Sequence, residues 1–581
     1  MSARIVLDDA IKTATHDQDK VISPNETVSR FHEKARYLDI EILKETRRID
    51  NGRLDIPVYF SICGDEVSKL TGTTKQMGKG ANPAQSQASA VMELVERFSF
   101  FAFNADDTRF TTATWQEAGK NTIGIDLMLK SVHDKDTSPE AAKTILKNIP
   151  FRWIPAWNLT KKQEFLIPFD WFFTINEFNG PSAGNCKEEA ICQGISEVVE
   201  RHVCSIVSQQ KLSPPTIDPD TATDPAVLEM LEKYRKNEIE LVFSDLSLDT
   251  GIPTIGILAW DPKTFPTSSE LVWTAGTAPD PQKAMSRALT EVAQLAGDFN
   301  TCANYVASGL PKFTTLKEAT FIFQAKESLS VEDLPNLSDP NIRYEIERMT
   351  QALAQIGLEV FLVETTHPEL AIPCFYTMIP GAHFRERSQG TSLPMFAARL
   401  ITEKFSPLEA LSRIQEIEEV VGERYDLSFY KGKMLLESGF HEKALAAFKK
   451  AMSCNPEPQE IPSICSWMGV CLKELGEYSK ALATLEEGIK RDPEREDIYN
   501  LMGFCFFMLK EHEKAIDAFR DVLRLNPNSA IDYANIASNY RELGRTEKAI
   551  NYYKMALEMD PEIEFARDNL KRLTASLSTA P

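Results

Sequence analysis

Glutamates recur at helical spacing in two stretches of this 581-residue chain, and carboxylates grouped in this way can hold metal ions. Residues 197–201 read Glu-Val-Val-Glu-Arg, and residues 93–97 read Glu-Leu-Val-Glu-Arg, which is the same order of charged and apolar residues. Around the later copy, spacings of three, four and eight residues predict one helical face that carries Glu189, Gln193, Glu197, Glu200 and Arg201.

The three carboxylates on this face repel each other unless a positive charge lies among them. Mg²⁺ suits this position because it prefers oxygen ligands and usually shares them with substrate phosphates. Two helices with one acidic pattern could therefore face each other across metal ions. The alternative is a pair of amphipathic helices with solvated Glu and Arg faces, but the repetition of the pattern favours a binding site.

The residues before each acidic pattern predict the helices that position it. Apolar residues at helical spacing between 190 and 203 indicate one buried face. Asn185 is the expected N-cap of this helix, with Glu188 at the capping-box position. In the earlier stretch, Asn82 is the expected N-cap, Pro83 the first helical residue and Gln85 the third.

Residues 72–80 contain three glycines, and we expect them to form a loop that leads into the first acidic helix. The segment is close to a P-loop, but it has one residue too many between Gly72 and Gly78, and Gly80 stands where Ser or Thr would hold Mg²⁺. We therefore reject a P-loop. Lys79 still precedes a helix N-terminus, which is a favourable place for a phosphate group.

Apolar, β-branched and aromatic runs predict strands over much of the first 400 residues, at 54–63, 151–158, 164–173, 239–243, 254–260, 271–275, 359–363 and 372–380. A third helix is predicted to begin at Asp280 and Pro281 and to carry Arg287, Glu291 and Gln294 on its polar face. Strands and helices alternate without a regular βαβ rhythm, so the pattern predicts an α+β domain over residues 1–400.

From about residue 421 the sequence repeats. Gly432, Gly469, Gly503 and Ala537 recur, and each is followed twelve residues later by an alanine, at 444, 481, 515 and 549. This is the 34-residue pattern of tetratricopeptide repeats (TPR), in about four copies over 421–581, with 401–420 as a linker or first helix. We expect an all-α superhelix that binds peptides or proteins on its concave face. A helical cap that only stabilises the first domain is the alternative.

Composition excludes several classes of protein. The net charge of -21 and the pI of about 5.0 argue against general binding of nucleic acids or anionic membranes. No apolar run is long enough for a transmembrane helix, and the N-terminus is too acidic for a signal peptide. The ten cysteines are scattered without a Cys-x-x-Cys motif, so we expect free thiols in a reducing cytoplasm and no zinc site.

Taken together, residues of about 45–390 resemble the YcaO family of ATP-dependent peptide-backbone cyclodehydratases. The motifs that carry the resemblance occur in family order over more than 300 residues, at 54–57, 78–80 with Ser86, 93–97, 182–185, 188–190, 197–201 and 287–291 with Gln294. The resemblance implies ATP and Mg²⁺ as cofactors and a nucleotide site made of glutamates instead of a P-loop. It implies a homodimer only as an analogy.

The resemblance also implies a role for each matching residue. Lys79 and Ser86 would contact the nucleotide, and Asn185, Arg201 and Arg287 would complete the site. The Mg²⁺ ions and the phosphates would be held by Glu93, Glu96, Glu189, Glu197 and Glu200.

The chemistry that the resemblance implies is activation of a backbone amide. A nucleophile adds to the carbonyl carbon, and the resulting oxyanion takes the γ-phosphate of ATP. Phosphate then leaves, which gives an azoline, an amidine or a thioamide according to the nucleophile. The enzyme contributes positioning and electrostatic stabilisation. The TPR repeats would recruit a peptide or protein substrate, or a partner protein.

Three features depart from the family pattern. His202 stands where the family often has Asp, Leu295 and Ala296 follow Gln294 where an arginine is common, and the sequence ends after the repeats in Ser-Leu-Ser-Thr-Ala-Pro instead of a proline-rich tail. These departures affect azoline formation more than nucleotide binding. Two alternatives therefore stay open: a nucleotide-binding TPR scaffold that supports another enzyme, and a metal-dependent hydrolase that activates water.

Overall fold

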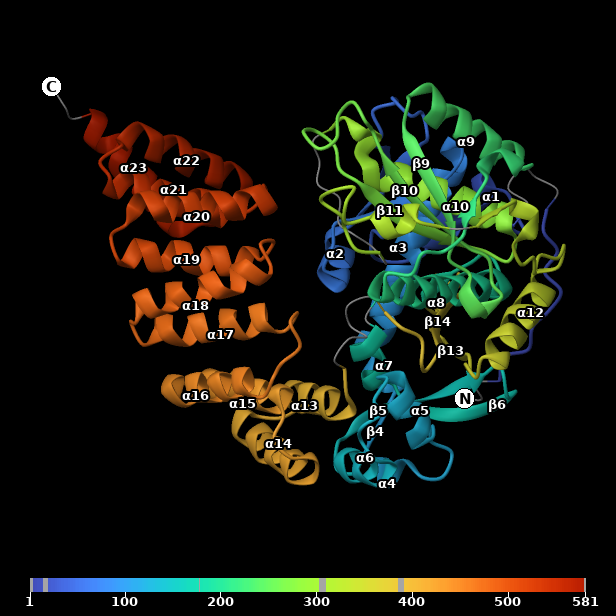
Figure 1. Cartoon of the computed structure of the whole chain (residues 1–581), viewed down its shortest axis with the longest axis horizontal. Coiled ribbons are helices and arrows are strands. Elements are labelled where there is room, and N and C mark those ends of the chain that lie inside the picture. Colours follow the sequence, from blue (N-terminus) through green and yellow to red (C-terminus); the bar gives the residue numbers. More distant parts are fainter. Residues whose placement is uncertain are drawn as a thin grey trace. The chain divides into compact units, whose positions relative to one another are not determined.

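The computed structural model describes residues 4–13, 19–176, 178–301, 310–325, 327–384 and 391–578, and the chain divides into two compact units, Met1–Leu393 and Pro394–Pro581 (Figure 1). The first unit contains three sheets, and the second contains only helices in its described part. No described helix is long and apolar enough to cross a membrane. The cysteines of the described residues are all free, as the sequence predicts.

The first sheet is antiparallel and consists of β1 (Leu43–Arg48), β2 (Val58–Cys63) and β3 (Lys75–Lys79). The prediction of a loop over residues 72–80 is therefore wrong for most of that segment. Residues 75–79 are extended because they pair with β2, with Val58 opposite Lys79 and Ile62 opposite Lys75. Sequence-local signals cannot show this pairing, because the partner strand supplies the hydrogen bonds.

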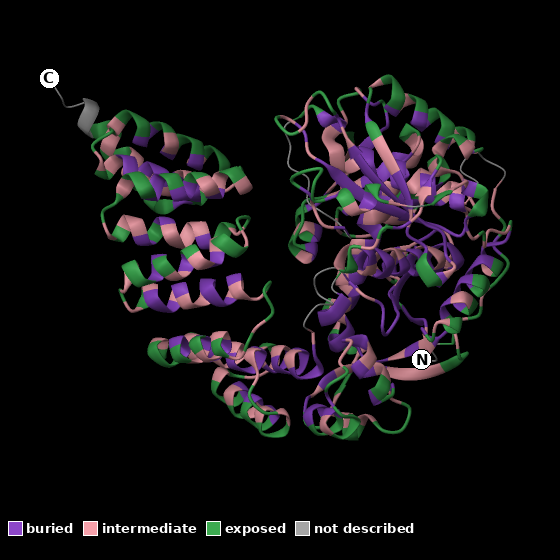
Figure 2. Cartoon of the chain, viewed as in Figure 1, coloured by how far each residue is buried: buried purple, intermediate pink, exposed green. Residues whose placement is uncertain are grey.

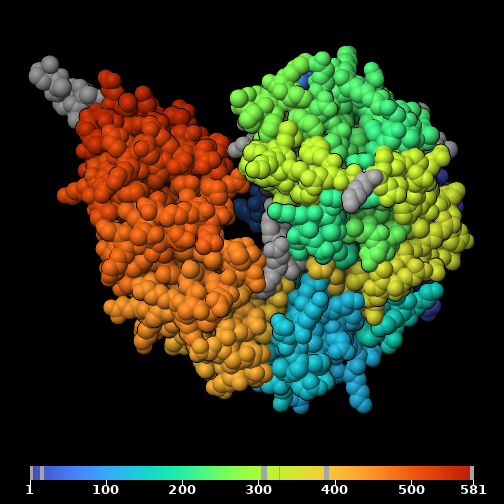
Figure 3. Space-filling view, viewed as in Figure 1, coloured from blue at the N-terminus to red at the C-terminus, as the bar shows by residue number. Residues whose placement is uncertain are grey.

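The two larger sheets lie at opposite ends of the first unit, with helix α8 between them (Figure 1). In the space-filling view, the green surface of the residues around β9 and the cyan surface of the residues around β4 and β5 lie correspondingly far apart (Figure 3). The second sheet has the order β11-β10-β9-β8-β12. Its strands are β8 (Thr216–Ile217), β9 (Glu240–Asp245), β10 (Thr254–Trp260), β11 (Val272–Thr277) and β12 (Ser328–Leu329). The third sheet has the order β4-β5-β13-β14-β7, and β6 pairs with β5. Its strands are β4 (Thr111–Ala113), β5 (Phe151–Asn158), β6 (Gln163–Pro168), β7 (Pro181–Ala183), β13 (Phe361–Glu364) and β14 (Cys374–Met378).

The described strand pairs are antiparallel apart from β8 with β12, which confirms the predicted α+β class. The strand predicted over residues 164–173 is correct only for its first half. Residues 163–168 form β6, but residues 169–176 form helix α7 (Phe169–Asn176). Asp170 in this helix accepts hydrogen bonds from the backbone and the side chain of Arg152 on β5, so the helix is fixed by a partner on another element, 18 residues earlier in the sequence.

Three helices carry the polar patterns that the sequence analysis singled out: α3 (Pro83–Ala105), α8 (Lys187–Gln210) and α10 (Pro281–Ala296). Each buries its apolar face against a sheet, α3 on β2 and β3, α8 on β14 and β11, and α10 on β11 and β10. Figure 2 shows α8 and the second sheet as the most continuously buried part of this unit. The other helices are α1 (Pro24–Ala35), α2 (Asp65–Thr71), α4 (Trp115–Ala118), α5 (Ile125–Ser131), α6 (Pro139–Leu146), α9 (Pro225–Lys236), α11 (Thr320–Phe323) and α12 (Ile342–Gln355).

The second unit is a stack of antiparallel helix pairs, which confirms the predicted TPR array. It begins with α13 (Leu393–Lys404) and α14 (Pro407–Val421), so residues 401–420 are mostly helical. Four repeats follow: α15 (Tyr425–Glu437) with α16 (His441–Ser453), α17 (Ile461–Glu474) with α18 (Tyr478–Arg491), α19 (Glu496–Met508) with α20 (His512–Leu525), and α21 (Ala530–Glu542) with α22 (Thr546–Met559). Helix α23 (Glu564–Ser578) ends the array.

Gly78 determines how closely α3 packs on β3. A Cβ atom at this position would lie 2.0 Å from the backbone nitrogen of Ala90 and 2.4 Å from the carbonyl oxygen of Ser86. We expect Gly78→Ala to lower the free energy of unfolding by about 3 kcal/mol or more, because helix and strand must separate. Thermal unfolding of the full chain checks this. Gly124→Ala is the control, since nothing lies within 4 Å of a Cβ there. Equal melting temperatures for the two variants would contradict the packing argument.

Candidate functional site

The two copies of the acidic pattern meet at one site. Burial raises the pKa of Glu197 on α8, Arg201 and Arg97 act in the opposite direction, and Glu93 of α3 adds to the rise. Glu93 and Arg97 belong to the other helix, so side chains that are about a hundred residues apart in the sequence act on one carboxyl group. The arrangement is the one expected of two helices that face each other with the same charged pattern.

Each pattern is partly neutralised by its own arginine. The Arg97 guanidinium donates to Glu93 Oε1 from Nη2 at 3.0 Å and from Nε at 3.2 Å. Arg201 is held more loosely, with 3.9 Å between its Nη2 and Glu197 Oε1, and 4.0 Å between its Nη1 and Glu200 Oε1. The buried Nε of Arg201 has no hydrogen-bond partner among the described residues. Arg201 therefore keeps an unused donor inside the site.

Negative charge remains in excess at Glu96. This residue is buried on α3, and burial raises the pKa of its carboxyl group well above the ordinary value, with a further contribution from the adjacent Glu93. Arg97 opposes this shift, at a distance of 3.7 Å between its Nε and Glu96 Oε1. One arginine is shared by two carboxylates here, so an added cation would stabilise the ionised form of both.

Positive groups approach the same site from β3 and α10. Lys79 forms an ion pair with Glu291 of α10. Burial lowers the pKa of Lys79 to about 8, and the neighbouring guanidinium of Arg287 acts in the same direction. Arg287 donates from Nη1 to Gln193 Oε1 on α8 at 2.8 Å, and its buried Nε has no hydrogen-bond partner in the described part of the chain. Lys79, Arg201 and Arg287 thus form a cationic group beside the carboxylates.

Three of the sequence-predicted site residues, Ser86, Glu189 and Glu200, bind backbone groups in this structure. The Ser86 hydroxyl donates to the carbonyl oxygen of Gly78 at 2.9 Å, and Glu200 Oε2 accepts from the backbone N–H of Thr277 at 3.0 Å. Glu189 accepts from the Asn185 backbone N–H at 2.8 Å and from its side-chain amide at 2.9 Å. These bonds fix the start of α3, the end of β11 and the start of α8.

The expected helix cap at Asn185 is wrong by one residue. Cys186 occupies the N-cap position of α8 and makes no side-chain capping bond. The Asn185 amide is instead engaged by Glu189, and Glu188 accepts a hydrogen bond from the backbone N–H of Asp8, so it does not close a capping box. The N-terminal segment thus binds Glu188, the side chain that the local sequence predicts to close a capping box.

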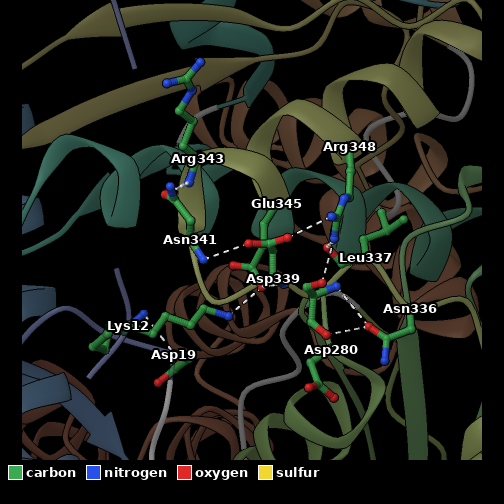
Figure 4. Close-up of polar contacts among 12 residues, drawn as sticks. Lys12, Asp19, Asp280, Asn336, Leu337, Asp339, Asn341, Arg343, Glu345 and Arg348 are labelled. Carbon is green, nitrogen blue, oxygen red and sulfur yellow. Dashed lines mark hydrogen bonds and ion pairs between the residues drawn. The ribbon is translucent and has the colours of Figure 1, made fainter. Parts of the chain in front are cut away.

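The N-terminal segment packs against α12, where Lys12 approaches Glu345 (Figure 4). Lys12 pairs with Glu345 of α12 at 2.5 Å between Nζ and Oε1, and the backbone N–H of Val21 donates to Glu189 Oε1 at 2.5 Å. A cavity of about 30 Å³ lies here, with Glu189 and Arg287 among its lining residues. The outer wall of the site is therefore built from residues that are far from the acidic helices in sequence.

Glu291 is the site residue that the sequence reasoning left without a role. Its position four residues after Arg287 places both on one face of α10, and that spacing is visible in the sequence. The partner, Lys79, is not visible there, because it lies on a strand more than two hundred residues earlier. Glu93, Glu96, Glu197, Arg201, Arg287 and Lys79 are brought together by three helices and one strand.

The donor set fits Mg²⁺ with a phosphate-bearing ligand. Among the described residues no group of three or more His, Cys, Asp or Glu side chains stands ready as a metal cage. Mg²⁺ does not need one, because it usually takes one or two protein carboxylates and completes its shell with waters and phosphates. The carboxyl groups of Glu96 and Glu197, whose pKa values are raised, would bind the metal ion. Arg201 and Arg287, whose Nε atoms have no partner among the described residues, would bind the phosphate groups.

Comparisons with known proteins agree with this chemistry. A family model described as YcaO cyclodehydratase, ATP- and Mg²⁺-binding, matches residues 77–383, which is more than half of the chain. Two TPR models match residues 435–505 and 494–562. An uncharacterized protein of Methanothermobacter thermautotrophicus is 27% identical over 387 residues, which cover 62% of this chain and 94% of that protein.

The matches with two further proteins cover a smaller share of those proteins. The Escherichia coli ribosomal protein S12 methylthiotransferase accessory factor YcaO is 26% identical over 307 residues, which cover 49% of this chain and 50% of that protein. A solved heterocyclase in complex with substrate and cofactor has a TM-score of 0.53 and 23% identity, over 66% of this chain and 54% of its own. This chain thus spans about half the length of both proteins, and the heterocyclase shares its fold.

The raised pKa of Glu96 predicts a pH-dependent instability of the nucleotide-free protein. The folded protein keeps a proton on Glu96 above the pH, near 4.5, at which the unfolded chain releases it, so stability falls as pH rises above that value. We expect Glu96→Gln to raise the melting temperature in EDTA by about 2 °C or more at neutral to alkaline pH, and less near pH 5. Calorimetric melting at several pH values checks this.

The exposed Glu140 on α6 provides a matched control, because Glu140→Gln removes the same charge outside the site. A Glu96→Gln variant that melts no higher than wild type at any pH would show that repulsion at this position is absent.

Proposed function

This chain belongs to the YcaO family of ATP- and Mg²⁺-binding cyclodehydratases, and we propose that it activates a backbone amide of a peptide or protein at the expense of ATP. The observation that carries the proposal is that the buried Glu96 and the partly buried Glu197 lie beside Lys79, Arg201 and Arg287. A site with a group of carboxylates beside a group of cationic side chains suits a metal–phosphate ligand. The carboxylates would bind its metal ion, and the cationic side chains would bind its phosphates.

The residues of this site would divide the work by charge. Glu93, Glu96 and Glu197 would hold Mg²⁺, while Lys79, Arg201 and Arg287 would bind phosphate oxygens by charge-assisted hydrogen bonds. Bound ATP supplies the phosphoryl group that converts the amide oxygen into a leaving group. The side chains would contribute by positioning the two reactants and by stabilising the negative charge that develops between them.

Glu200, Glu189 and Ser86, which bind backbone groups, would also belong to the proposed nucleotide site. Glu200 uses one oxygen for Thr277 and keeps Oε1 near Arg201 for an ion. Glu189 Oε1 accepts one hydrogen bond, from Val21, and keeps a lone pair for an ion, whereas Oε2 already accepts two hydrogen bonds from Asn185. Ser86 would act through the end of β3, where its hydroxyl binds the carbonyl oxygen of Gly78 next to Lys79.

The TPR unit would recruit the polypeptide substrate or a partner protein. Repeats of this kind bind extended peptides along an array of helices. A tethered substrate reaches the active site at an effective concentration set by its linker, so recruitment raises the rate without any new catalytic group. Azoline, amidine and thioamide products all fit this scheme, because they differ only in the nucleophile.

An accessory role is the second candidate, and it is favoured by the similarity to the E. coli methylthiotransferase accessory factor. In that case the chain would bind nucleotide and assist a separate modifying enzyme. Both candidates require the same nucleotide site, and they differ in whether this chain alone changes a polypeptide.

We expect Mg²⁺-dependent binding of a non-hydrolysable ATP analogue to the full chain, and Glu197→Gln to weaken it at least tenfold, or about 1.4 kcal/mol, because a buried metal ligand is lost. Isothermal titration calorimetry checks this, with Glu140→Gln as the charge-matched control. Equal affinities in the wild type and Glu197→Gln would remove α8 from the nucleotide site.

The two candidate roles separate in a reconstituted reaction. Purified chain, ATP and Mg²⁺ are added to an extract of cells that lack the chain, and polypeptides are searched by mass spectrometry for loss of water or replacement of oxygen by sulfur. The enzyme proposal expects such products with a substrate purified from the extract, and none with Glu197→Gln. Products that require a second protein in addition to that substrate would favour the accessory role.

A further inference from the structure

Strand β3 lies at one edge of the first sheet, and one row of its backbone groups points away from its neighbour β2. In an antiparallel pair, residues that bond across the pair alternate with residues whose N–H and C=O groups point to the other side. The backbone N–H of Cys63 on β2 donates to the carbonyl oxygen of Thr74 at 3.1 Å, which fixes this alternation. In the register of the pair, Lys75 and Met77 therefore point their backbone groups outward.

These outward backbone groups are open to another chain. The N–H and C=O groups of Lys75 and Met77 take part in no hydrogen bond among the described residues. Lys75 is exposed and Met77 is partly exposed. Because buried backbone groups are almost always paired, the groups of this edge face solvent. They present donors and acceptors in the alternation that an added strand uses.

The neighbours of β3 lie on its two faces. Helix α3 packs closely on the face of Gly78. Side chains alternate between the faces of a strand, so Met77 and Lys79 point to the other face, where side chains of α10 meet them. The Lys75 ammonium lies 4.4 Å from the centre of the Phe60 ring, so this side chain also lies on a face and not across the edge. In the described part of the chain, the edge itself is left open.

The edge leads directly to the proposed nucleotide site. Lys79, which belongs to the cationic group of that site, lies two residues beyond Met77 on the same strand, or about 7 Å further. The outward N–H of Lys79 is engaged by Ser89 Oγ of α3 at 3.4 Å, so the open part of the edge stops there. A strand that pairs with Lys75 and Met77 would therefore pass into the region where the phosphates are proposed to bind.

The opposite edge of the sheet is less suited to pairing. Strand β1 carries Lys44, Glu45, Arg47 and Arg48, and charges along an edge strand oppose the addition of another strand. Strand β3 carries charges only at its two ends, at residues 75 and 79.

We propose that an extended segment of the substrate polypeptide pairs with β3 as an antiparallel fourth strand of the first sheet. Because the added strand runs opposite to β3, the amide that is activated lies on the N-terminal side of the paired segment. Hydrogen bonds between backbones do not depend on the identity of the side chains, so this pairing suits an enzyme that acts on a backbone amide. The inference rests on the proposed function for the identity of the ligand as a polypeptide, and it adds the surface that binds it.

The faces of the sheet give the pairing a register. Residues directly opposite each other in an antiparallel pair place their side chains on one face. The substrate residues opposite Lys75 and Met77 therefore lie on the face of Phe60, which is apolar and partly exposed. Apolar side chains fit this face, and a slip by one residue would move them to the face that α3 covers.

Binding of two isomeric peptides to the nucleotide-free full chain tests this pairing. The parent probe is acetyl-(Val-Ser)₃-amide, and saturation-transfer NMR detects it. One isomer carries N-methyl groups on the three valines, and the other carries them on the three serines. The valine-methylated isomer is expected to bind at least tenfold more weakly than the serine-methylated one, because only the valine N–H groups point at β3.

Met77→Pro tests the same edge from the protein side. Proline is tolerated where the N–H of an edge strand faces solvent, so this change removes one outward donor and keeps the bonds to β2. It should weaken binding of the parent probe at least tenfold. Thr46→Pro is the matched control, because the N–H of Thr46 faces outward on β1 at the opposite edge, and it should bind the probe as the wild type does.

Equal binding of the two isomers, no detectable binding of the parent probe, or equal effects of the two proline variants would overturn the proposal. If Met77→Pro fails to fold, the two isomers alone decide. Glu197→Gln should bind the parent probe normally. Failure of the wild type to bind the ATP analogue, with the difference between the isomers intact, would count against the proposed function alone.

Discussion

Two glutamates that ionise readily in water, the buried Glu96 and the partly buried Glu197, lie on different helices of this protein, and the architecture of the first unit depends on how their charge is compensated. In addition to burial, Glu93 and Glu197 both raise the pKa of Glu96, Glu93 also raises that of Glu197, and Arg97 and Arg201 oppose this repulsion only in part. Burial of unbalanced charge is costly, so the site is stable only while the surrounding apolar contacts hold the helices in place. Those contacts are the packing of α3 on the first sheet, of α8 on strands of the second and third sheets, and of α10 on the second sheet.

The local part of this arrangement could be predicted from the sequence. Asn82 caps α3 by accepting the backbone N–H of Gln85, and Asp280 caps α10 in the same way through Gln282, as expected from the residues alone. Helical periodicity also predicted which polar residues share a face. The TPR array was predictable for a similar reason, because each repeat packs mainly on its sequence neighbours and leaves a periodic signature.

The non-local part could not be predicted in this way. Residues 75–79 form a strand because β2 lies beside them, and Asn185 fails to cap α8 because Glu189 engages it. The pair of Lys79 with Glu291 joins residues more than two hundred positions apart. The family resemblance supplied the identity of most candidate site residues, but it gave no indication that several of them hold backbone segments in position. Ligand binding at the proposed site would therefore be coupled to the fold.

The central claim is that a metal–nucleotide ligand joins the anionic and cationic halves of this site. Its most direct test is a crystal structure of the full chain with a non-hydrolysable ATP analogue and Mn²⁺, with anomalous scattering used to locate the metal. The account predicts anomalous peaks beside Glu96 and Glu197, with the phosphates against Lys79, Arg201 and Arg287. Well-ordered nucleotide elsewhere, with the carboxylates still paired to their arginines and no metal beside them, would contradict it.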